Sequence, residues 1–133
     1  MTDHVDFELV SPERLLFSRG VDMVVVPGAE GDFGVLPRHS PLISAIRPGV
    51  IKVYEQGQVT ETIFVADGFA EVTPSRCTVL AEEAMPVGDI DRAEVEHQLK
   101  NLQDDLLDTK TDEDKAAIQR KIATAAAKLQ VSS

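Results

Sequence analysis

The stretch Met85-Pro-Val-Gly-Asp-Ile-Asp-Arg-Ala-Glu-Val95 divides the sequence into two parts of different composition. All eight glycines and all seven prolines of the 133-residue chain lie at or before Gly88, and none follows it. Glycine and proline are frequent in turns between strands, and both break helices. The sequence therefore predicts a β domain over residues 1–87 and a helical domain over residues 88–133.

The first part contains several short runs with the pattern of β-strands. Val5, Phe7 and Leu9 alternate with polar residues, and the β-branched run Val21–Val26 is stopped by Pro27-Gly28. Two hairpins are predicted as well, Val50–Tyr54 with Val59–Val65 around Glu55–Gln58, and Phe69–Val72 with Cys77–Leu80 around Thr73–Arg76. Short strands at this spacing are typical of a β-sandwich or flattened barrel.

The second part has the period of two amphipathic helices. Val95, Leu99, Leu102 and Leu106 are spaced by four, three and four residues, which places them on one helical face. The same spacing recurs in Ile118, Ile122, Ala125 and Leu129. A short break at about residues 109–112 predicts antiparallel neighbours. We therefore expect an α+β fold, an N-terminal all-β sandwich or flattened barrel followed by a C-terminal antiparallel helical hairpin.

Capping signals precede both predicted helices. Asp91 with Glu94 resembles a capping box, and Thr111 with Asp114 does so more loosely. The second helix is rich in alanine, and such small side chains bury little apolar area. The hairpin alone is therefore expected to be marginally stable, so that it docks on something or moves between partners.

Composition and charge favour an acidic globular protein of a reducing, intracellular compartment. The chain is 43% hydrophobic, and its formal net charge of −10 disfavours binding to nucleic acid or to an anionic membrane surface. No apolar run approaches the length of a membrane span, and the first residues lack the pattern of a signal peptide. The single cysteine, Cys77, cannot form an internal disulfide.

The sequence offers little that predicts catalysis. His4, His39 and His97 are far apart, and with one cysteine they form no zinc signature. The adjacent carboxylates Glu82 and Glu83 would point to opposite faces of a strand, which favours a solvated face over an acid/base pair. The glycine-rich stretch that begins at Pro27 lacks the Gly-Lys-Ser/Thr ending of a phosphate loop, so a tight loop between strands is predicted.

The same stretch resembles a known family. Pro27-Gly-Ala-Glu-Gly-Asp-Phe-Gly-Val-Leu-Pro-Arg-His-Ser-Pro-Leu42 is similar to the signature of the epsilon subunit of F-type ATP synthases. Three further matches follow in order: Ile46-Arg-Pro-Gly-Val50, Val65-Ala-Asp-Gly-Phe-Ala-Glu-Val72 and Thr78-Val-Leu-Ala-Glu-Glu-Ala84. The resemblance covers nearly the whole chain.

The resemblance implies a non-catalytic rotor subunit of the central stalk, peripheral to the cytoplasmic face of a bacterial inner membrane. Such a subunit links the gamma subunit to the ring of c subunits in proton-driven ATP synthesis and requires no cofactor. By motif position, Asp32 and His39 fall in a loop that faces the ring, with Glu30 and Arg38 beside them.

The resemblance also implies a regulatory hairpin, which in the family extends into the alpha/beta catalytic head and blocks ATP hydrolysis. Some bacterial members bind regulatory ATP at an aliphatic-Asp-x-x-Arg-Ala motif. Here Asp89-Ile-Asp-Arg-Ala93 supplies all of it except the aliphatic residue, where Gly88 stands. The candidate nucleotide-binding residues are Glu83, Asp89, Arg92 and Arg120.

Two other functions compete with the rotor assignment. One is a free-standing ligand-binding β-sandwich that dimerises through its helical hairpin. The other is a small hydrolase that uses Glu82 or Glu83. Neither explains the match from Pro27 to Leu42.

Overall fold

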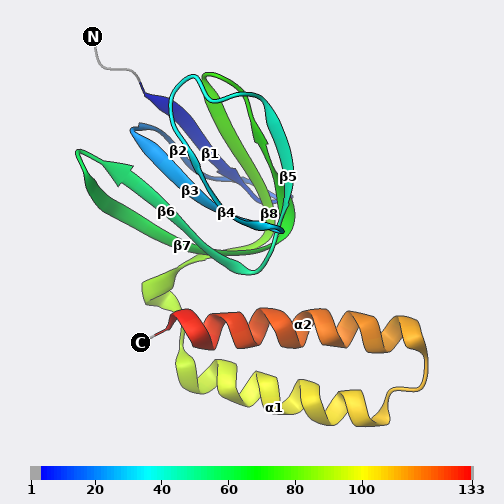
Figure 1. The fold of residues 1–133 in the computed structure, drawn as a ribbon. Coiled ribbons are helices and arrows are strands. Elements are labelled where there is room, and N and C mark those ends of the chain that lie inside the picture. Colours follow the sequence, from blue (N-terminus) through cyan, green and yellow to red (C-terminus); the bar gives the residue numbers. More distant parts are fainter. Residues whose placement is uncertain (1–3, 133) are drawn as a thin grey trace. The chain divides into compact units, whose positions relative to one another are not determined.

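The computed structural model describes residues 4–132, and the chain divides into two compact units, Met1–Pro86 and Val87–Ser133. The first unit is built of β-strands, and the second contains two helices (Figure 1). The expected α+β fold, a β-sandwich followed by a helical hairpin, is therefore confirmed.

The first unit is an eight-stranded sheet in which seven strands follow one path of neighbours and the sixth strand of the sequence lies off that path. In sequence order the strands are β1 (Val5–Val10), β2 (Leu15–Val21), β3 (Met23–Gly28), β4 (Gly31–Val35), β5 (Leu42–Ile46), β6 (Gly49–Glu55), β7 (Gln58–Val72) and β8 (Arg76–Pro86). The spatial order is β2-β1-β8-β7-β5-β3-β4, and β6 pairs with both β3 and β7. The β1–β8 pair is parallel, and the other pairs are antiparallel. The strands enclose a core that is mostly valine and isoleucine, with Phe7 and Leu9 among its largest buried side chains.

The period-two pattern correctly predicted which side chains enter that core. Val5, Phe7 and Leu9 of β1 are all buried, and residues between them are partly exposed. The predicted β6–β7 hairpin is also confirmed, with Gln56 and Gly57 as its two turn residues. Both have positive φ, 54° and 77°, which matches the twist of a tight hairpin.

Several strands differ from the prediction. The run from Val21 is broken at Asp22, and β3 continues through Pro27-Gly28, whose residues pair with Asp32 and Gly31 of β4. Proline has no N–H to donate to a ladder, and at this position its carbonyl accepts a bond from the Arg47 amide at 2.9 Å. The strands β2, β4 and β5 were not predicted, since glycine, polar and exposed residues interrupt their apolar alternation.

The two helices of the second unit follow a short 3₁₀ turn at Val87–Asp89. They are α1 (Arg92–Asp108) and α2 (Asp112–Val131), which pack side by side (Figure 1). Both predicted caps are confirmed. Asp91 accepts a bond from the Glu94 amide at 3.2 Å, and Thr111 accepts one from the Asp114 amide at 3.1 Å.

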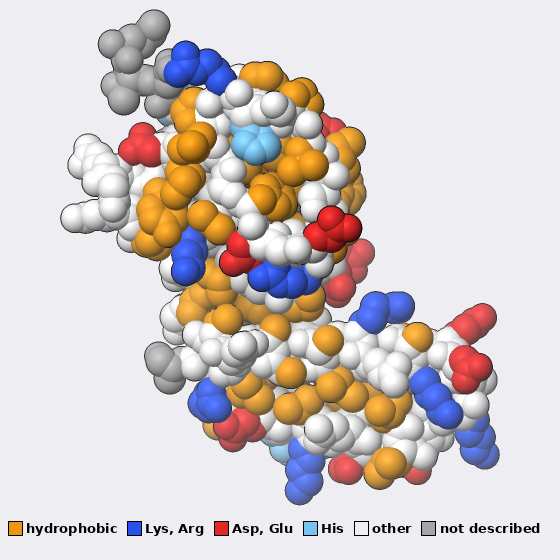
Figure 2. All heavy atoms as spheres, viewed as in Figure 1, with side chains coloured by type: hydrophobic (Ala, Val, Ile, Leu, Met, Phe, Trp, Pro, Cys, Tyr) orange, Lys and Arg blue, Asp and Glu red, His pale blue; other side chains and the backbone are white. Residues whose placement is uncertain are grey.

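The hairpin is amphipathic, with a thin apolar interface. Val95 and Ala125 are buried, whereas Leu99, Leu102 and Leu106 are partly exposed. Figure 2 shows hydrophobic side chains along the line between the two helices, with charged side chains around them. Over residues 4–132, neither helix combines the length and the apolar character needed to cross a lipid bilayer.

Candidate functional site

A short acidic turn projects where β3 meets β4. Ala29 and Glu30 form the turn, and both are exposed. Asp32, the second residue of β4, accepts a bond from Nη2 of Arg47 at 2.5 Å. Nη1 of the same arginine donates to the Gly28 carbonyl at 2.6 Å. We call residues 29–32 the acidic tip.

Arg38 and His39 lie beyond the other end of β4. Their backbone is ordered by the neighbouring β7–β8 turn, because the Arg38 amide donates to the Pro74 carbonyl at 2.7 Å. Arg38 has a φ of 65°, and Nδ1 of His39 lies 2.6 Å from the Ser40 carbonyl oxygen. We call this segment the Arg38–His39 bend.

The four residues predicted to share one loop therefore occupy two places. Glu30 and Asp32 belong to the acidic tip, and Arg38 and His39 belong to the bend. The strand between them covers roughly 13 Å at about 3.3 Å per residue. The prediction overlooked this separation because the two glycines of β4 conceal a strand.

An apolar row crosses the outer face of five strands. Neighbouring partners in the register are Ala45 of β5, Phe69 of β7, Leu80 of β8, Val10 of β1 and Leu15 of β2. Phe69 is 45% exposed and Leu15 is 55% exposed, and the nearby Ile43 of β5 is 71% exposed. A shallow groove lined by Pro12, Phe69 and Leu80 lies along this row. The name apolar row is used below for Ala45, Phe69, Leu80, Val10 and Leu15.

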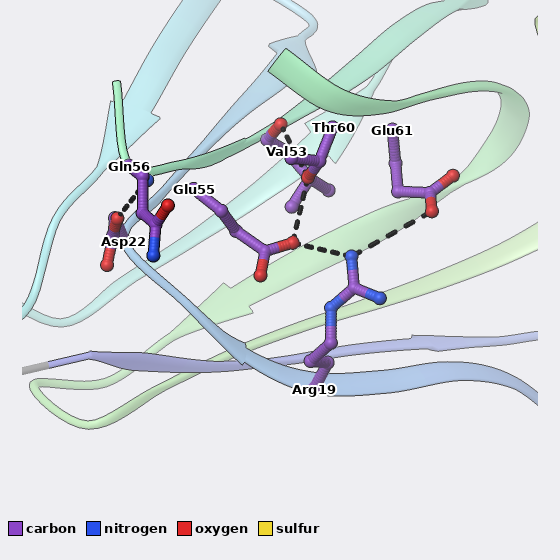
Figure 3. A network of polar contacts seen from close by, with 7 residues as sticks. All are labelled: Arg19, Asp22, Val53, Glu55, Gln56, Thr60 and Glu61. Carbon is purple, nitrogen blue, oxygen red and sulfur yellow. Dashed lines mark hydrogen bonds and ion pairs between the residues drawn. The ribbon is translucent and has the colours of Figure 1, made fainter. Parts of the chain in front are cut away.

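A polar network joins β2 to the β6–β7 hairpin (Figure 3). Nη2 of Arg19 lies 2.5 Å from Oε1 of Glu55 and 3.8 Å from Oε1 of Glu61. The Gln56 amide donates to the Asp22 carboxylate at 2.6 Å. These contacts fasten β2, at one end of the path of strands, to the β6–β7 hairpin, so the network stabilises the fold.

The candidate nucleotide residues do not converge within the hairpin. Nη1 of Arg92 donates to the Leu129 carbonyl at 2.8 Å and to Oγ of Ser132 at 3.2 Å. Arg120 is exposed nine residues before Leu129, which is about 13 Å along a helix at 1.5 Å per residue. Asp89 ends the 3₁₀ turn, and Glu83 belongs to β8 of the first unit. Arg92 is thus engaged with the end of α2.

The other side chains considered for catalysis or metal binding do not come together in a site. In the register of β8, Glu82 and Glu83 are consecutive and face opposite sides of the strand. No cluster of three metal-ligating side chains occurs among the residues that the structure describes. Cys77 is fully buried, and the loss of hydration raises the pKa of its thiol to about 12. Such a thiol is neutral and unreactive at neutral pH.

Sequence reasoning missed two features of this surface. One is the contact of Arg47 with Asp32. The two residues are fifteen positions apart, and Arg47 stood out in the sequence only within the motif Ile46–Val50. Phe69 was assigned to a strand without being placed on its outer face. Ala70 and Val72 are buried, and successive side chains of a strand point to opposite faces, so Phe69 points to the outer face.

Comparisons with known proteins identify the family. Residues 4–87 match the family model for the β-sandwich domain of the ATP synthase delta/epsilon chain, and residues 91–133 match the model for the C-terminal domain of the ATP synthase epsilon chain. The protein is 52% identical over 127 residues to an ATP synthase epsilon chain from Paramagnetospirillum magneticum, covering 96% of each. It is 51% identical over 129 residues to one from Rhodospirillum rubrum, covering 97% of this chain and 96% of that one.

Two solved structures share the fold at low sequence identity. One, titled as a Euglena gracilis mitochondrial ATP synthase, OSCP/F1/c-ring, aligns with a TM-score of 0.77 at 20% identity over 98% of this chain and 81% of that one. The other, titled as a Tetrahymena thermophila mitochondrial ATP synthase central stalk and c-ring, gives a TM-score of 0.68 at 15% identity over 97% and 96%. With both family models matched in order and half of all residues identical to curated relatives, the chain belongs to the ATP synthase epsilon-chain family.

Proposed function

We propose that this protein is a non-catalytic central-stalk subunit of an F-type ATP synthase. In this role it joins the gamma subunit to the ring of c subunits, so that rotation driven by proton flow reaches the catalytic head. The observation that carries the proposal is the identity of 52% over 96% of the chain to a protein named ATP synthase epsilon chain. The subunit would lie at the cytoplasmic face of a bacterial inner membrane, held there by the complex.

The β unit supplies two surfaces of suitable chemistry. The apolar row is a continuous strip with two side chains about half exposed, which suits a permanent protein interface. We assign it to gamma. The acidic tip and the Arg38–His39 bend are polar, which suits the polar loops of the ring and its surroundings. Their separation along β4 allows two different contacts.

The helical hairpin is assigned a regulatory role. Its interface rests on few buried residues, Val95 and Ala125 among them, so separation of the helices costs little. An extended hairpin would reach the alpha/beta head and oppose ATP hydrolysis. ATP is a candidate regulatory ligand, and Arg92 would have to exchange its present carbonyl partners for phosphate oxygens.

The assignment of the apolar row to gamma predicts a selective loss of binding. Phe69→Ser with Leu15→Ser should weaken binding of the full-length protein to the catalytic head with gamma by about tenfold or more, because apolar anchors dominate such interfaces. Sedimentation or surface binding measures the affinity. Val59→Ser is the matched control, since Val59 is 45% exposed like Phe69 but lies outside the row.

Two results would contradict the proposal. If the double variant binds as tightly as the wild type, the apolar row is not the gamma-binding surface. If the wild-type protein does not join the complex and sediments as a stable homodimer, the rotor role itself is wrong and the ligand-binding alternative gains support.

A further inference from the structure

We propose that Arg47 is the positioning residue of the acidic tip, holding it in the conformation that presents Glu30 to the partner. This inference rests on the proposed function, in which the tip faces the ring of c subunits. Arg47 comes from the corner between β5 and β6, whereas the tip joins β3 to β4. A residue of a separate element therefore controls the shape of the tip.

The tip has little packing of its own. Ala29, Glu30 and Gly31 are all exposed. Gly31 has a φ of 140°, and a side chain there would meet no atom within 4 Å. The Ala29 amide donates to the Ala45 carbonyl at 2.9 Å, and beyond this bond the shape of the turn depends on the polar contacts of the residues at its base.

Arg47 supplies contacts on both sides of that base. Its Nη1 donates to the Gly28 carbonyl at 2.6 Å, just before the turn, and its Nη2 donates to Oδ1 of Asp32 at 2.5 Å, just after it. The planar guanidinium fixes the angle between these two bonds, which an ammonium group cannot do. Arg47 is itself anchored, because its amide donates to the Pro27 carbonyl at 2.9 Å.

The two acidic residues of the tip, Glu30 and Asp32, have different roles. The positive charge of Arg47 offsets the negative charge of Asp32, so Glu30 carries the remaining negative charge of the tip. Among the residues that the structure describes, Glu30 makes no hydrogen bond or ion pair. Its carboxylate is therefore available to an amide donor or a cation on a polar loop of the partner.

The first test measures the order of the tip in the full-length protein. Arg47→Gln should speed hydrogen exchange of the amides of residues 29–32 by about tenfold or more, corresponding to the loss of one or two hydrogen bonds. Arg47→Lys should speed exchange less than Arg47→Gln does, because lysine keeps the positive charge and loses only the paired N–H groups of the guanidinium. Arg19→Gln is the matched control, since it removes another exposed arginine–carboxylate pair, that of Arg19 and Glu55, outside the tip.

The second test asks whether this order matters for binding. Affinity is measured for a complex of catalytic head, gamma and c ring that lacks this subunit. Arg47→Gln and Glu30→Gln should each weaken binding by about tenfold, and the double variant should be no weaker than either single one. Non-additivity is expected because both act through the same carboxylate.

The outcomes separate this inference from the function on which it rests. Unchanged exchange at residues 29–32 in Arg47→Gln, or fully additive effects of the two substitutions on affinity, would overturn the positioning role. If Glu30→Gln leaves affinity unchanged while Arg47→Gln still loosens the tip, the control of tip shape stands and the assignment of the tip to the ring is wrong.

Discussion

Cys77 is the residue whose environment gives the clearest pH dependence. Its thiol is buried in β8, and burial raises its pKa from 9.0 to about 12. Below pH 9 the thiol is neutral in both the folded and the unfolded state. Above pH 9 the unfolded state loses this proton while the folded state keeps it, so the free energy of unfolding falls as pH rises toward 12.

We predict that Cys77→Ala removes the contribution of this thiol to the pH dependence of the free energy of unfolding. Between pH 9 and 11, the wild type should lose stability relative to the variant by up to about 1.4 kcal/mol per pH unit. Below pH 8.5 the difference should be constant, because it reflects only lost packing. Urea unfolding at a series of pH values measures it. A difference that stays constant up to pH 11 would contradict the prediction.

Individual residues also explain where sequence reasoning succeeded. The burial of Phe7 and the caps at Asp91 and Thr111 depend on neighbours within a few positions, and all were predicted. The pairing of Asp32 with Arg47 depends on how β3, β4 and β5 are arranged, which no local pattern encodes. Local rules therefore identified elements, whereas the contacts of the candidate site required the fold.

At the scale of elements, β7 shows why strand boundaries were misplaced. The sequence predicted two strands around residues 66–68, but β7 runs from Gln58 to Val72 without interruption. It pairs with β6 over its first part and with β5 over its second, so the polar Asp67 lies at the change of partner. A side chain at Gly68 would place its Cβ 1.7 Å from the Leu80 carbonyl oxygen, so this glycine permits close strand approach.

The element most open to experiment is the end of the helical hairpin. The Arg92 guanidinium joins the first turn of α1 to the carbonyl of Leu129 in the last turn of α2. A cation at a helix C-terminus also interacts favourably with the helix dipole. The contact therefore stabilises the end of the hairpin opposite the connection between the helices.

We predict that Arg92→Gln loosens the last turn of α2. Hydrogen exchange of the amides of residues 129–132 should become faster by about tenfold, since hydrogen bonds from a charged donor are lost. Lys100→Gln is the control, because it removes an exposed charge in the middle of α1. It should leave the exchange rates of those amides unchanged. Equal protection in wild type and Arg92→Gln would show that α1 and α2 hold together without this contact.

At the scale of the whole molecule, the two units differ in how their stability is built. The hydrophobic core of the first unit lies entirely between Val5 and Ala84, so a protein that ends after Gly88 keeps all of it. The second unit has a sparse core and many charged residues on its surface. A stable unit joined to a marginal one suits a subunit whose first part holds position while its second part changes state.

This division predicts separate effects on assembly and on hydrolysis. A protein that ends after Gly88 should join the catalytic head and gamma as the full-length protein does, and ATP hydrolysis should be about fivefold faster or more, because the proposed inhibitory contact of the hairpin with the head is removed. The full-length protein with Arg120→Glu, Lys121→Glu and Lys128→Glu is the matched variant that keeps the hairpin and should also hydrolyse ATP faster. Equal rates from all three assembled complexes would mean that the subunit couples rotation without restraining hydrolysis.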